Sequence, residues 1–106
     1  MPGSKSKTSE KIDDIIEKLT KEKEKLQKKR QEAFDLHTPA GNQKMADLWQ
    51  EIVEVDAKIS TATSEQNAYI KIRSQKMKDL EDGKIKKDVY DDVMEGERKR
   101  MKCLKY

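Results

Sequence analysis

The amino-acid sequence predicts an all-α fold, an elongated antiparallel helical hairpin or coiled coil with one long central helix flanked by two others. Apolar residues recur at heptad spacing, and two marked turns interrupt the pattern. Charged residues make up 42% of the 106 residues and apolar residues only 33%. Soluble domains usually have roughly 25% charged and about 45–50% apolar residues. This composition therefore excludes a thick core, and we do not expect an enzyme built around a sheet.

The first helix is predicted over residues 9–37. Its apolar seam consists of residues seven apart, with companions three positions on: Ile12, Leu19, Leu26 and Ala33, with Ile15 and Leu36. Glu22 and Lys29 fall on the same seam, so the helix needs a partner. Ser9 is the expected N-cap. Residues 1–8 are expected to form a flexible basic tail before a single helical rod over 9–106.

The second helix is predicted over residues 40–82, because Pro39 interrupts the first helix and suits the first turn of a new one capped by Thr38. The segment 60–64 is the weak point of this helix, since Thr63 to Gln66 resembles a capping box. We favour one continuous helix and keep a break there as the alternative. Gly83 is suited to the left-handed position that ends a helix.

A shorter third helix is predicted over residues 86–102. Short connections bring consecutive helices back antiparallel, so residues in contact across the first turn should have numbers that add up to about 79. The first helix then runs out near residue 70, and the third helix covers the remainder of the central one. Such a thin rod buries little apolar surface and should be only marginally stable alone. We therefore expect it to bind other protein subunits.

No pattern of residues indicates an enzyme, a metal site or a cofactor. His37 is the only histidine and Cys103 the only cysteine, and nothing in the sequence brings them together as a catalytic pair. A single cysteine excludes an internal disulfide. No apolar run is long enough to span a membrane, and no signal peptide is apparent. We expect a location in the cytoplasm, the nucleus or a virion, without secretion.

Cations at the two ends are the first candidate binding residues. At the C-terminal end, residues 98–106 contain five cations and no acid. Such a cluster can bind phosphates or an acidic protein surface, or it can simply complement the negative end of a helix dipole. The candidates for phosphate or acidic-partner binding are Lys5, Lys7, Arg98, Lys99, Arg100, Lys102 and Lys105.

The second set of candidate binding residues consists of apolar side chains that the chain cannot bury by itself. Trp49 lies at the edge of the seam, where it either caps the hairpin core with Phe34 or anchors a partner. Tyr69, Ile70 and Ile72 lie at 100° steps on a helix and cannot all face one seam, so at least one of them must be exposed or meet another chain. The candidates for partner binding are Trp49, Tyr69, Ile72, Val89 and Val93.

These observations favour a non-enzymatic structural or scaffold subunit that bridges or cements partners in a larger assembly, such as a minor virion protein or a cytoskeletal component. One alternative is an accessory protein that binds nucleic acid non-specifically through its basic termini. Another is a homodimeric coiled-coil adaptor.

Overall fold

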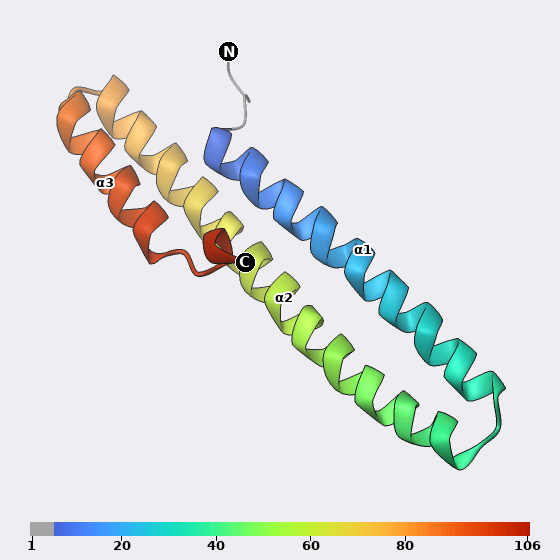
Figure 1. The fold of residues 1–106 in the computed structure, drawn as a ribbon. Coiled ribbons are helices and arrows are strands. Elements are labelled where there is room, and N and C mark those ends of the chain that lie inside the picture. The colour runs from blue at the N-terminus through green and yellow to red at the C-terminus, as the bar shows by residue number, and fades with distance from the viewer. Residues whose placement is uncertain (1–5) are drawn as a thin grey trace.

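The protein is an all-α rod, as the sequence predicts. The computed structural model describes residues 6–106. Three α-helices are followed by a short 3-10 helix: α1 (Lys7–Asp35), α2 (Pro39–Glu81), α3 (Lys87–Arg100) and η1 (Cys103–Lys105). The molecule measures 67 × 24 × 15 Å. Figure 1 shows α1 and α2 as an antiparallel hairpin, with α3 beside the second half of α2.

The first helix begins earlier than predicted. Ser6, not Ser9, is the N-cap, and its hydroxyl oxygen accepts a hydrogen bond from the Ser9 backbone N–H at 3.1 Å. Ser9 is buried in the first turn of α1. The predicted tail over residues 1–8 is therefore too long, because Lys7 and Thr8 are helical; residues 1–5 of that tail lie outside the described residues.

The first turn confirms the role of Thr38 and Pro39. The Thr38 hydroxyl accepts from the Gly41 N–H at 3.0 Å, and Pro39 occupies the first helical position. His37 has a φ of 51°, a left-handed conformation that ends α1 at Asp35 rather than at residue 37. Gly41 is needed because a Cβ there would lie 2.6 Å from the Ala33 carbonyl oxygen. The two helices thus meet closely at the turn.

The register of the hairpin is the one predicted. The Arg30 guanidinium lies 5.1 Å from the centre of the Trp49 ring, and Lys23 Nζ lies 2.7 Å from Asp56 Oδ1. Near the other end of α1, Gln66 Nε2 donates to Asp13 Oδ1 at 2.6 Å. The residue numbers of each pair add up to 79. The long helix is continuous through residues 60–64.

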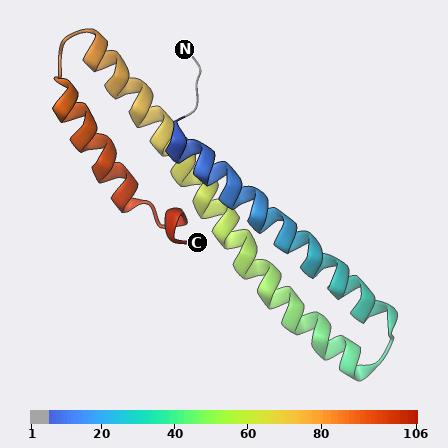
Figure 2. The ribbon, with the colours of Figure 1, turned by 45° about the horizontal axis from the view of Figure 1, so that its top comes forward.

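The last part of the chain returns to the middle of the hairpin. Gly83 has a φ of 74°, and the chain reverses there into α3, which lies on the side of α2 away from α1 (Figures 1 and 2). The predicted helix over 86–102 ends earlier, at Arg100. Met101 is extended, and the chain then turns through Lys102 into η1, which packs against both α1 and α2.

Candidate functional site

The main buried cluster, here called the junction, joins all parts of the chain. Its members are Ile12 of α1, Ala62 and Tyr69 of α2, Met94 of α3, and Met101 and Cys103 of the C-terminal segment. Because these residues are far apart in the sequence, the junction holds the hairpin, α3 and the C-terminal segment as one body.

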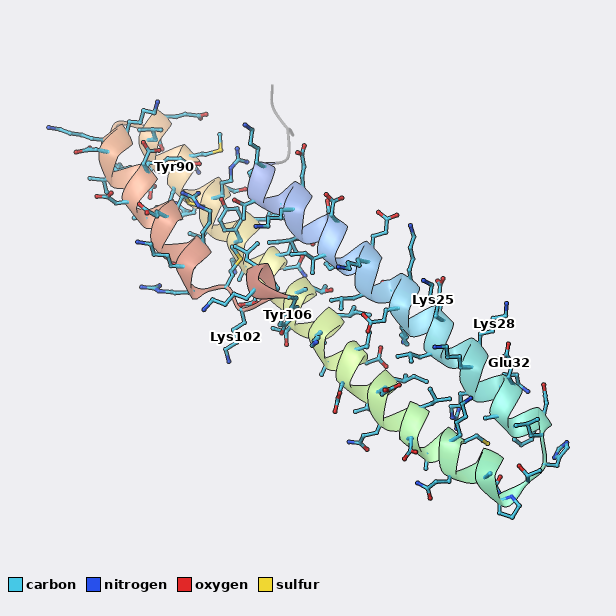
Figure 3. The ribbon with its side chains drawn as sticks, in the orientation of Figure 1. Lys25, Lys28, Glu32, Tyr90, Lys102 and Tyr106 are labelled. Carbon is cyan, nitrogen blue, oxygen red and sulfur yellow. The ribbon has the colours of Figure 1, made fainter. Side chains whose placement is uncertain are left out.

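Glu65 anchors the C-terminal segment to α2. Its two carboxylate oxygens accept from the backbone N–H groups of Lys102 at 2.8 Å and of Cys103 at 2.9 Å. A carboxylate that accepts two backbone N–H groups forms charge-assisted hydrogen bonds, which are stronger than neutral ones. Nearby, Lys58 Nζ lies 5.6 Å from the centre of the Tyr106 ring, and Figure 3 shows Tyr106 against α2.

Cys103 is sealed in the junction. Its side chain is inaccessible to solvent. Burial raises the pKa of the Cys103 thiol to about 11, and the hydrogen bond to Glu65 and its negative charge act in the same direction. Since the thiolate is the nucleophilic form of cysteine, this environment keeps Cys103 unreactive.

A second feature lies near the first turn and is exposed. We call it the hairpin-end patch, and its residues are Arg30, Phe34, Met45, Trp49 and Val53. Arg30, Phe34 and Met45 line one side of a groove of about 460 Å³ together with two glutamines. Phe34 is 50% and Trp49 52% exposed. The Trp49 side chain therefore does not cap the hairpin core, whose seam is filled by Ala33 and Leu48.

The apolar candidates separate into buried and exposed residues. Tyr69 is 3% exposed and belongs to the junction. The prediction that it contacts a partner is therefore corrected, because its side chain is buried within its own chain. Ile72 is partly buried against the junction, whereas Ile70 is exposed, so the prediction that one of these three residues stays exposed is confirmed. Val89 is 43% exposed and Val93 is half-buried.

The basic candidates do not form one continuous cluster of free cations. Lys99 Nζ lies 3.4 Å from Glu95 Oε1, and Arg100 Nη1 lies 3.1 Å from Glu97 Oε1. The other described candidates, Lys7, Arg98, Lys102 and Lys105, are exposed, and Figure 3 shows the Lys102 side chain directed away from α2. Lys5 lies outside the described residues.

His37 and Cys103 lie far apart in the structure. His37 is in the turn at one end, where its ring meets Phe34 edge-on at 5.5 Å, while Cys103 lies in the junction near the middle of the rod (Figure 1). Among residues 6–106 no group of three histidine, cysteine or acidic side chains could hold a metal ion. In the same part of the chain, no helix combines the length and apolar character needed to cross a membrane.

The fold and its surfaces thus define an elongated helical hairpin with a locked junction and an exposed patch. Comparisons with models of protein families, with curated proteins and with solved structures found no match.

Two important residues were missed from the sequence. Glu65 resembles part of a capping box for its own helix, but it caps a segment 37 residues further along. No local pattern could have shown that pairing. Arg30 could have been identified, because its position opposite Trp49 follows from the predicted register.

Proposed function

We propose that this protein is a non-enzymatic structural subunit that bridges partners within a larger assembly. The observation that carries the proposal is that a 67 Å rod leaves large apolar side chains exposed near both of its ends. Around the first turn these are Phe34, Leu36 and Trp49, and around α3 they are Met77 and Val89. Exposed apolar patches of this kind mark interaction surfaces.

The mechanism would be geometric. The 43 residues of α2 extend over about 65 Å at 1.5 Å per residue, and this helix runs through the whole molecule. Partners bound at its two ends would be held at a fixed separation. A minor virion protein and a cytoskeletal component both fit this role.

The test is to isolate the tagged full-length protein from its native cells and to determine the composition of its complex by native mass spectrometry and lysine cross-linking. We expect a constant stoichiometry, with cross-links to other subunits near both ends. Trp49→Ser should remove the contacts at the first turn and leave those near α3, and Val89→Asp should do the reverse. A chain that elutes alone from gentle lysates would contradict the proposal.

A second candidate function, non-specific binding of nucleic acid, is favoured by the charge of α1. Residues 18–30 contain seven basic and two acidic residues, and Lys25 and Lys28 are exposed and directed away from α2 (Figure 3). Such binding weakens steeply as salt rises. Fluorescence anisotropy with an arbitrary RNA and an arbitrary DNA duplex should then show salt-dependent affinity.

The variants for this second test are Lys25→Gln with Lys28→Gln, and Arg98→Gln with Lys105→Gln. Deleting residues 98–106 is not a clean alternative, because it would remove Met101 and Cys103 from the junction. Binding that either pair of substitutions weakens would favour the nucleic-acid function. Absence of salt-dependent binding would leave the structural role as the better account.

A further inference from the structure

The hairpin-end patch has a definite chemical character. It combines two half-exposed aromatic rings with one cation, since the Arg30 guanidinium lies over Trp49. The Nε atom of Arg30 is buried and meets no hydrogen-bond acceptor among the described residues. The residues that line the groove beside it are Gln27, Arg30, Gln31, Phe34 and Met45, which include no acid. The patch is therefore complementary to an apolar surface that carries carboxylates.

A surface of that kind exists at the other end of the same molecule. On α3, Asp91 and Asp92 lie three and four residues after Asp88, and Glu95 lies four and three residues after them. The four carboxylates therefore share one side of the helix, and all four are exposed. Val89 is exposed beside them. We call these five residues the acidic face of α3.

The two surfaces cannot meet within one chain. Figure 1 shows the first turn and α3 at opposite ends of the rod, and the rod is 67 Å long. They can meet only between copies.

We propose that the hairpin-end patch of one chain docks on the acidic face of α3 of a second copy. Phe34 and Trp49 would cover Val89, and Arg30 would donate hydrogen bonds to the α3 aspartates. Two copies lying antiparallel make this contact twice, which strengthens the pair through effective concentration. The inference rests on the proposed structural role and names one of the partners as another copy of the chain.

The test is sedimentation of the purified full-length chain over a wide range of concentrations, at low and at high salt. We expect the sedimentation mass to rise above that of one chain as the protein concentration rises. At high salt the mass should fall again, because the contacts between Arg30 and the α3 aspartates are ionic and are screened by salt. Trp49→Ser and Asp92→Arg should each weaken association at least about tenfold. Asp14→Arg, the same charge change at an exposed residue outside both surfaces, should have little effect.

A mixing experiment gives the sharpest result. Arg30→Glu and Asp92→Arg should each associate poorly alone, but an equimolar mixture should recover the association, because every contact in the mixed pair again joins opposite charges. Circular dichroism establishes that each variant is still helical. A chain that is monomeric at every concentration, or association that neither Trp49→Ser nor Asp92→Arg weakens, would overturn the inference. The structural role would survive that result if the native complex retains its stoichiometry.

Discussion

The attachment of the C-terminal segment depends on Glu65, because its carboxylate accepts hydrogen bonds from two backbone N–H groups of that segment. Glu65→Ala should release the segment and expose Cys103. We expect the rate of reaction of Cys103 with a thiol reagent to rise by at least about tenfold, since losing hydrogen bonds to a charged group costs about 1.5–3 kcal/mol.

The matched control is Glu54→Ala, at an exposed glutamate of the same helix. It removes the same charge without touching the C-terminal segment, so the thiol reactivity should stay at the level of the unmodified protein. Equal reactivity in the two variants would show that Glu65 does not hold the segment.

The raised pKa of Cys103 predicts an unusual pH profile for alkylation. Burial raises the pKa of the Cys103 thiol in the folded chain from 9.0 to about 11, so less of the reactive thiolate is present at any pH between these values. The alkylation rate should keep rising, about tenfold per pH unit, through pH 10. In the same chain unfolded in urea, the rate should be half-maximal near the ordinary pKa of 9.0 and level off about one pH unit higher. Coinciding profiles would mean that the folded environment does not disfavour the thiolate.

At the scale of the helices, two glycines should respond in opposite directions to the same substitution. A Cβ at Gly41 would meet the Ala33 carbonyl oxygen at 2.6 Å, whereas a Cβ at Gly96 of α3 has nothing within 4 Å. Gly41→Ala should lower the free energy of unfolding by on the order of 1–3 kcal/mol through overpacking. Gly96→Ala should raise it by about 1 kcal/mol, because alanine is the better helix former.

Urea unfolding followed by circular dichroism measures the free energy of unfolding of each variant relative to the unmodified protein. Each variant serves as the control for the other, because both replace glycine by alanine inside a helix. Shifts of the same sign would contradict the close approach of α1 and α2 at the turn.

The helices, the turns and the register could be predicted from the sequence because each depends on local signals. Pro39 and Gly83 mark the turns, and the length of the first turn then fixes which residues of α1 and α2 meet. The N-cap was misplaced because Ser6 and Ser9 both satisfy the capping rule. The end of α3 was misplaced because Met101 leaves the helix to reach the junction, a tertiary contact that no helical period reveals.

At the scale of the whole molecule, the junction and the hairpin end should differ in stability. The junction unites four segments of the chain, whereas the hairpin end is only two helices thick. Local opening is easier where few buried contacts oppose it. Native-state hydrogen exchange should therefore be slowest around residues 62–69 of α2 and faster around 44–52.

Glu65→Ala should reduce protection at the junction and leave the hairpin end nearly unchanged. Uniform protection along α2 would contradict this division.

The candidate interaction surfaces were predictable only in part, because the burial of some of their residues depends on tertiary contacts. Exposure of Trp49 and Val89 follows from their positions beside a narrow seam, and both were identified. Tyr69 was not distinguished from its neighbours, because its burial depends on α3 and the C-terminal segment packing on the same side of α2. The acidic face of α3 follows from the spacing of its carboxylates in the sequence, but the sequence does not show which surface it meets.

The first turn also has a consequence for how the chain can exchange parts with other copies. A hairpin can swap one arm with a neighbour by opening into a single straight helix, which would remake the same contacts between α1 and α2 across two chains. Here, straightening residues 36–38 would place the Pro39 ring against the Asp35 carbonyl and remove a hydrogen bond, at a cost of about 3 kcal/mol. Domain swapping is therefore disfavoured, and each chain keeps its own hairpin while its two ends remain available for contacts with neighbours.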